Sequence, residues 1–385
     1  MGVWLAGIFT SSTAGRTIFP GSDIFVPLLL IGIMWPLIYF GVARHKFTLG
    51  CFPIDVLVVT SIFFLICAIS CFVSTVPLLS IGLMLLTLVS VCEIVQFGSI
   101  MTYVTMENAL RTYAFSTSVI LTMFAVYDYV PGIRLGNGHL ILNPNTIGLV
   151  CMSVIVSAFA IRNIPGRLIV AIASSTVLVL TGSRASSVGA ILGVIVVLLL
   201  RRPEKGKIKR RVLMALVFLC FAVAMMFWPN KLIRPVESYF AVHSHDRGWN
   251  SGATGRIYLW RDTWQLFLSN PVIGVGFRAD EAESSHNGYL AMLAETGILG
   301  TSCVVYIIIR GLISMWNRAR IRGFEYGNPF SILVGLGAGY LLIGFFERYI
   351  INVGNPTSML FLIAVFSYPH QVSNPPVETR CGAGG

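Results

Sequence analysis

Three basic side chains in this chain are of types that suit group-transfer chemistry. Arg184 lies in the run TGSRA, Arg256 in TGRIYLW and His286 in SSHNGYL. A histidine has an ordinary pKa near ~6.5, so it can take a proton from a hydroxyl near neutral pH. Guanidinium groups stay charged and bind phosphate oxygens in a bidentate fork. Together, one base and two phosphate-binding cations are a minimal set for transferring a group to a hydroxyl. The leaving group would be a phosphate, and no metal would be needed.

Each of these residues also has a simpler explanation. Arg184 would serve equally as an anchor that reaches the lipid headgroups, and Arg256 as a lipid-phosphate contact. A lone histidine where a helix begins is often only a hydrogen-bonding residue, and Ser284 or Ser285 can cap that helix.

Several familiar motifs are missing from the sequence. It contains no Walker loop, no GxGxxG fingerprint, no Asp-x-Asp pair and no His/Cys cluster of zinc spacing. An ATP-driven pump and a metal-dependent nucleotide-sugar enzyme are therefore disfavoured, and we expect no metal and no cofactor. The eight cysteines have no CxxC spacing, and seven lie in or beside apolar runs, so we interpret them as packing residues.

The elements that must position these residues follow from composition. Of 385 residues, 56% are hydrophobic and only 11% are charged, whereas soluble domains are roughly 25% charged. This composition predicts an all-α polytopic membrane protein with about 11–12 transmembrane helices, forming a single membrane domain over 1–385. The formal net charge of +11 could suggest nucleic acid, but the placement of the charges indicates membrane orientation instead.

A membrane helix needs ~20 mostly apolar residues. The run 167–200 is broken at 182–184, and we interpret it as two spans joined by a tight turn because an arginine in mid-membrane is costly. Whether the first residues, Met1 to Gly15, form a partial span is left open. The predicted spans are 24–43, 52–73, 77–98, 113–130, 145–161, 167–182, 185–200, 212–228, 287–309, 328–346 and 355–369.

Lys and Arg in short loops give the orientation. Strict alternation places four basic clusters on one side, which we take as cytoplasmic, and leaves one larger loop, 229–285, on the outer side. The tail 374–385 is polar and predicted to be disordered inside the cell. The basic clusters are Arg44/Lys46, Arg162/Arg167, 201–211 and 310–322.

The outer loop contains a predicted helix over 255–268. Trp260, Trp264 and Phe267 fall at i, i+4 and i+7, on one helical face. The helix lies either on the outer membrane surface or against the bundle, and Asn270-Pro271 ends it.

Glu295 lies nine residues after His286, inside the predicted span 287–309. Nine residues turn a helix by about 180°, so the two side chains do not share a face. An ionisable group at this depth needs a partner or a function. We expect Glu295 to pair with another span, as a supporting residue.

Four runs closely resemble, in order, the signature of the O-antigen ligase and polymerase superfamily. They are NPN with Gly148, TGSR, TGRIYLW followed by NPVIGVG, and SHNGYLAMLAETGILG. The resemblance implies a glycosyltransferase that uses an undecaprenyl-diphosphate-linked glycan at the periplasmic face of the bacterial inner membrane. It further implies that His286 is the base and that Arg184 and Arg256 bind the diphosphate. We expect Asn287 and Glu295 to be supporting residues of this site.

The resemblance does not determine which acceptor receives the glycan. A ligase of lipopolysaccharide or surface-polysaccharide assembly would use the lipid A core, whereas an O-antigen or exopolysaccharide polymerase would use another lipid-linked glycan. A protein-glycosylating relative is a third reading. A transporter of lipid-linked glycan is less favoured, because we find no internal repeat and the basic residues lie at one face.

Overall fold

The computed structural model describes residues 52–131, 133–137, 143–200, 256–278, 285–321, 327–351, 356–366 and 368. Throughout these ranges the regular structure is helical, which confirms the prediction of an all-α polytopic membrane protein. The predicted spans 24–43 and 212–228 and the tail 374–385 lie outside the described residues. The helices are α4 (Ile54–Val73), α5 (Pro77–Ile100), α6 (Tyr103–Asp128), α7 (Pro144–Ser157), α8 (Ile164–Thr181), α9 (Arg184–Leu199), α12 (Arg256–Ser269), α14 (Gly288–Ile321), α15 (Pro329–Ile343) and α16 (Pro356–Phe366).

Five of the described helices, α4, α5, α6, α8 and α14, are long and apolar enough to cross a membrane. Three shorter apolar segments are 144–160, α9 and α15. The main departures from the predicted bounds are in α6 and α14. Helix α6 begins ten residues before the predicted 113, at a capping box formed by Thr102 and Thr105. Helix α14 continues past the predicted end at 309 to Ile321.

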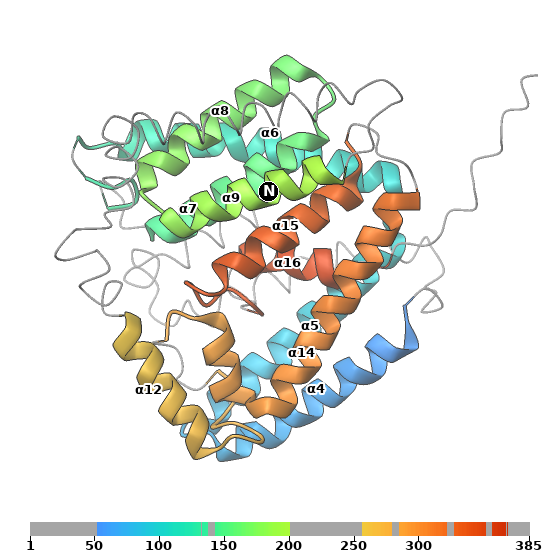
Figure 1. The fold of residues 1–385 in the computed structure, drawn as a ribbon, viewed down its shortest axis with the longest axis vertical. Helices are drawn as coiled ribbons and strands as arrows, with labels where there is room; N and C mark the ends of the chain where they lie inside the picture. Colours follow the sequence, from blue (N-terminus) through green and yellow to red (C-terminus); the bar gives the residue numbers. More distant parts are fainter. Residues whose placement is uncertain are drawn as a thin grey trace, which may run out of the picture.

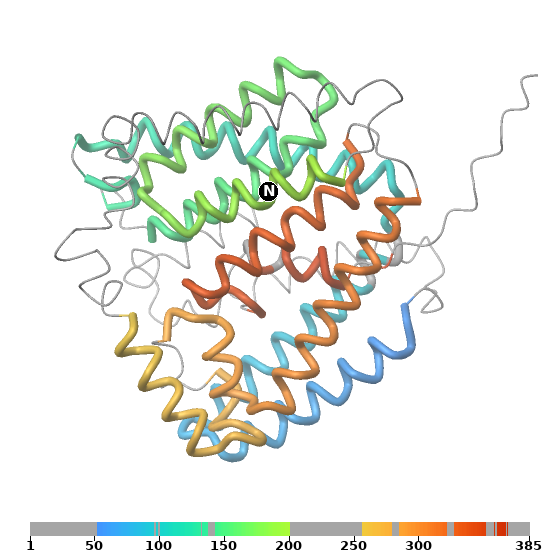
Figure 2. The backbone as a smooth tube through the Cα atoms, viewed as in Figure 1, coloured from blue at the N-terminus to red at the C-terminus, as the bar shows by residue number. Residues whose placement is uncertain are grey.

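The helices form two groups with a central pair between them. Figure 1 shows α6, α7, α8 and α9 on one side, α4, α5 and α14 on the other, and α15 with α16 in the middle. In the backbone trace, the orange α14 runs beside the blue α4 (Figure 2), and these two helices are in contact. Helix α15 contacts α9 of the first group and α14 of the second, so it joins the two groups.

Four glycines bring α9 and α15 into backbone contact. A Cβ at Gly193 would lie 2.9 Å from the carbonyl oxygen of Gly335, and one at Gly339 would lie 2.9 Å from that of Gly189. The pairs 189–339 and 193–335 run in opposite directions, so the helices are antiparallel. Small residues at this spacing let membrane helices approach closely. We call these four residues the glycine seam.

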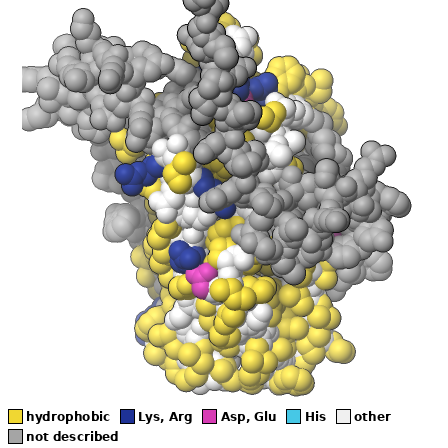
Figure 3. Space-filling model, turned by 90° about the vertical axis from the view of Figure 1, so that its right-hand side faces the viewer, with side chains coloured by type: hydrophobic (Ala, Val, Ile, Leu, Met, Phe, Trp, Pro, Cys, Tyr) yellow, Lys and Arg dark blue, Asp and Glu magenta, His cyan; other side chains and the backbone are white. Residues whose placement is uncertain are grey.

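One end of the molecule carries charged pairs beside the apolar core. Figure 3 faces the end at which α4 begins and α14 ends, and it shows several Lys or Arg side chains above a largely apolar lower part. Asp55 of α4 accepts hydrogen bonds from Tyr306 at 2.7 Å and from Arg310 at 2.8 Å, both in α14. Arg162, Arg167 and the described part of the basic cluster 310–322 belong to this end. We call it the inner end, because these clusters are predicted to be cytoplasmic.

Glu107 ties α6 to the segment between α7 and α8 at the inner end. Its buried carboxylate accepts hydrogen bonds from Arg162 at 2.7 and 2.8 Å and from Arg111 at 2.7 Å. Replacing Glu107 with alanine should destabilise the protein by roughly 1–3 kcal/mol, because charge-assisted hydrogen bonds are lost. Thermal unfolding in detergent measures this, with the exposed Asp262→Asn as control. Equal unfolding temperatures for Glu107→Ala and the control would contradict the prediction.

Candidate functional site

His286 lies just before α14, in a backbone conformation that is unusual for its type. Its φ is +46°, in the left-handed region, and its side chain is 54% exposed. Asn287 caps the helix, because its Oδ1 accepts the backbone N–H groups of Tyr289 at 3.0 Å and Leu290 at 3.1 Å. The prediction of a serine cap is therefore wrong: Ser285 instead hydrogen-bonds the backbone of Asn287. The short polar run thus fixes the backbone beneath the His286 ring.

Glu347, in the turn after α15, joins residues from three separate segments. Its Oε2 lies 3.7 Å from Nδ1 of His286. Its Oε1 accepts hydrogen bonds from Arg256 at 2.8 Å and from the amide of Asn145 at 2.7 Å. Arg256 also donates to the carbonyl of Phe346 at 2.7 Å. The Glu347 side chain is only 8% exposed, so one nearly buried carboxylate binds a predicted phosphate ligand, Arg256, and lies beside the predicted base, His286.

Glu347 was missed in the sequence. The available signal was its position in the run FFERYI, between the predicted spans 328–346 and 355–369. A carboxylate placed where a span ends, on the same side as His286 and Arg256, is a candidate partner for both.

Arg184, the third predicted residue, is the first residue of α9 and is half-buried. The turn before it has the predicted break: α8 ends at Thr181, and Gly182 has φ +58°. Arg184 thus reaches the same end of the bundle as His286 and Arg256, on a different helix.

Glu295 has a partner outside its own helix. It forms an ion pair with Arg348, which follows Glu347 in the turn after α15. Both side chains are nearly buried. The two successive residues of this turn therefore serve different partners, with Glu347 beside His286 and Arg348 beside Glu295.

The segment 288–321 is not the uninterrupted helix that we expected over 287–309. Gly297 has φ +61° and ψ −169°, which breaks the helix two residues after Glu295.

The loop after α12 supplies the missing backbone partners: Val275 N–H donates to the carbonyl of Ala294 at 2.8 Å, and Ile298 N–H donates to the carbonyl of Pro271 at 2.9 Å. Broken helices are tolerated in membranes where other groups satisfy the backbone in this way. The runs NPVIGVG and AETG thus form one structural unit.

Helix α12 confirms the predicted helix at 255–268 and packs against α14. Thr263 and Phe267 are buried, while Trp264 stays 43% exposed with its ring centroid 5.1 Å from that of Phe267. The structure therefore shows contact with the bundle, and the position on the outer membrane surface stays a prediction. Because Arg256 begins this helix, the contact also fixes Arg256 relative to α14.

Residues with strained backbone conformations lie around the beginning of α14, close to the candidate site. Among the described residues, the non-glycine positions with positive φ are Arg278, His286 and Ile351. Such conformations cost roughly 1–3 kcal/mol each and collect at functional sites. Arg278 and Ile351 line one small cavity together with Glu295 and Arg348, so all three strained residues surround the beginning of α14.

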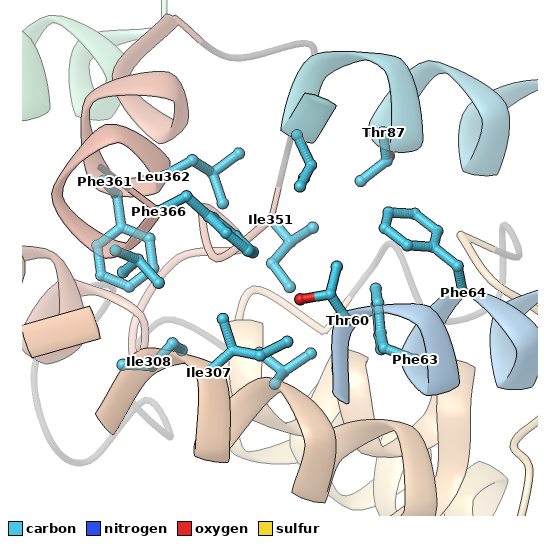
Figure 4. A pocket seen from close by; sticks show the side chains of 13 residues that line it. Thr60, Phe63, Phe64, Thr87, Ile307, Ile308, Ile351, Phe361, Leu362 and Phe366 are labelled. Atoms are coloured by element: carbon cyan, nitrogen blue, oxygen red, sulfur yellow. The ribbon is translucent and has the colours of Figure 1, made fainter. Parts of the chain in front are cut away.

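A second cavity lies between α4, α5, α14 and α16, and its lining is apolar apart from two threonines (Figure 4). It measures about 20 Å³, which is room for about one water. This cavity is too small for a substrate, so the polar cluster around Glu347 is the candidate site. Within the described ranges, His, Cys, Asp and Glu form no group of three that could hold a metal.

The fold and the site together define an all-α polytopic membrane protein with a basic and histidine-containing cluster at one end. A family model described as O-antigen ligase matches residues 169–305, and this match confirms the resemblance to the O-antigen ligase and polymerase superfamily. The match includes Arg184, Arg256, His286 and Glu295, whereas Glu347 lies beyond it. No curated protein matches the chain.

Proposed function

We propose that this protein is a glycosyltransferase that moves a glycan from undecaprenyl diphosphate to a hydroxyl acceptor at the periplasmic face of the bacterial inner membrane. The family match supports the general class. The observation that carries the proposal is the contact of one carboxylate, Glu347, with both His286 and Arg256. This contact supports the proposal, because the reaction requires a base close to a cation that can bind a phosphate.

In the proposed reaction, the acceptor hydroxyl oxygen bonds to the anomeric carbon of the donor sugar. The bond from that carbon to the diphosphate oxygen breaks, and undecaprenyl diphosphate leaves with the electron pair. A carboxylate beside Nδ1 favours the tautomer with its proton there, so Nε2 of His286 is free to accept the hydroxyl proton. Arg184 and Arg256 stabilise the charge that grows on the leaving diphosphate.

Transfer by purified protein in liposomes tests the proposal. The donor is a defined undecaprenyl-diphosphate glycan, and two parallel reactions offer either a lipid A core or a second lipid-linked glycan as acceptor. Product with the first acceptor indicates a ligase, and product with the second a polymerase. Both reactions are repeated with a chelator, and transfer should persist there. If transfer is lost with the chelator and restored by a divalent ion, the enzyme is not metal-independent. Absence of product with both acceptors would contradict the ligase and the polymerase forms of the proposal.

The proposed orientation can be tested at two exposed residues of the described structure. A cysteine at Asn137, near the candidate site, should react with an impermeant thiol reagent added outside spheroplasts. A cysteine at Arg320, near the inner end of α14, should react only after the membrane is opened. The parent protein, with its native cysteines, gives the background. The opposite labelling pattern would place the candidate site in the cytoplasm.

A further inference from the structure

Arg134 lies in the loop between α6 and α7, and the proposed reaction assigns it no role. Its Nε donates to the carbonyl of Thr181 at 2.7 Å, and its Nη2 lies 3.3 Å from the carbonyl oxygen of Gly182. These carbonyls belong to the turn that leads directly into Arg184. Its Nη2 also lies 3.4 Å from Oδ1 of Asn145, at the start of α7. One guanidinium therefore contacts both the turn before Arg184 and α7.

The backbone around Arg134 is itself held in place. The next residue, Leu135, is buried, and its N–H donates to the carbonyl of Leu180 at 3.0 Å. The N–H of Gly136 donates to the buried carboxylate of Asp128 at 2.6 Å. A Cβ at Gly182 would lie 3.2 Å from Nε of Arg134, so the guanidinium fits closely against this turn.

Asn145 extends the chain of contacts. While its Oδ1 faces Arg134, its Nδ2 donates to Oε1 of Glu347 at 2.7 Å. The same Oε1 accepts the hydrogen bond from Arg256, and the other oxygen of Glu347 faces His286. A continuous polar path therefore runs from the turn before Arg184, through Arg134, Asn145 and Glu347, to the other two predicted site residues.

We propose that Arg134 is a positioning residue that fixes Arg184 relative to Arg256, and that it does so through this path. The inference rests on the proposed function, because it gives those two arginines a shared diphosphate ligand. A diphosphate needs its cations at a set separation, and a preorganised pair loses little freedom on binding. The simpler role for Arg134 is as a cap on the last carbonyls of α8, which would affect stability alone.

Two measurements on purified protein separate these roles: binding of undecaprenyl diphosphate without sugar, and the KM and kcat of transfer. Arg134→Ala should weaken binding of the probe and raise the donor KM by about tenfold, the effect of one charge-assisted hydrogen bond. Arg134→Lys keeps the charge but loses the fork, so its effect should be intermediate. Arg167→Ala is the matched control, because Arg167 also holds a backbone carbonyl, that of Ile161, at the inner end.

A double-mutant cycle gives the sharper test. If Arg134 acts through Arg184, then Arg134→Ala should cost less than about twofold in probe binding when Arg184 is already alanine. Full additivity, or an Arg134→Ala protein that binds the probe as the wild type does, would overturn the inference. Wild-type protein that binds the probe but transfers no glycan would contradict the proposed function alone. Wild-type protein that does not bind the probe would contradict both.

Discussion

His286→Asn should reduce glycan transfer by about 10²–10⁴-fold, the usual contribution of a general base. Asparagine suits this position because it tolerates the left-handed backbone that His286 adopts, with φ +46°. It keeps a polar side chain beside Glu347 but cannot take a proton from the acceptor. The measurement is the initial rate of transfer in liposomes at saturating donor and acceptor.

The control for His286→Asn is a measurement of protein level in the membrane and of unfolding temperature. Because the His286 side chain is 54% exposed, membrane level and unfolding temperature should stay close to those of the wild type. His286→Ala should be as inactive but less stable, since alanine fits positive φ poorly. Transfer by His286→Asn within about threefold of the wild type would leave the proposed base without a role.

Arg184→Lys and Arg256→Lys should each slow glycan transfer by about ten- to a hundredfold. Lysine keeps the positive charge but loses the planar fork that binds phosphate oxygens. A charge-assisted hydrogen bond is worth roughly 1.5–3 kcal/mol, and each 1.36 kcal/mol is about tenfold in rate. Transfer from a defined lipid-diphosphate donor by the purified variants measures the effect.

Anchoring to lipid headgroups would give a different result. Lysine also reaches the membrane interface with its charge, so an anchoring arginine should tolerate the change. Arg167→Lys, at the inner end, serves as the control and should transfer within about twofold of the wild type. If Arg184→Lys and Arg256→Lys match this control, the two arginines do not bind the diphosphate.

The sequence predicted those parts of the fold that depend on neighbouring residues. The length of the apolar run alone predicted the span 52–73, and in the structure α4 covers Ile54–Val73. Arg184, in the middle of the apolar run 167–200, was enough to predict the turn at 182–184, because a charge in mid-membrane is costly. The helix at 255–268 followed from aromatic residues at helical spacing.

Contacts between distant segments could not be predicted in the same way. The break at Gly297 depends on backbone partners from the loop 271–276, and no local pattern distinguishes this glycine from one inside a regular helix. Glu347 meets His286 only because the start of α14 lies beside the end of α15, where Gly288 N–H donates to the carbonyl of Gly344 at 2.8 Å. The sequence therefore predicted candidate site residues but not the carboxylate that joins two of them.

The glycine seam limits how this protein can be engineered. Glycine-to-alanine substitution in helices is a standard way to raise thermal stability, worth roughly 0.4–1 kcal/mol where the alanine fits. At Gly193 and Gly335 the new methyl group would meet a carbonyl oxygen at 2.9 and 2.7 Å. It would push α9 away from α15. Arg184 begins α9 and Glu347 follows the end of α15, so both lie at the same end of this antiparallel pair and would move apart. Thermostabilised variants for structural work should therefore leave these glycines unchanged and seek substitutions elsewhere.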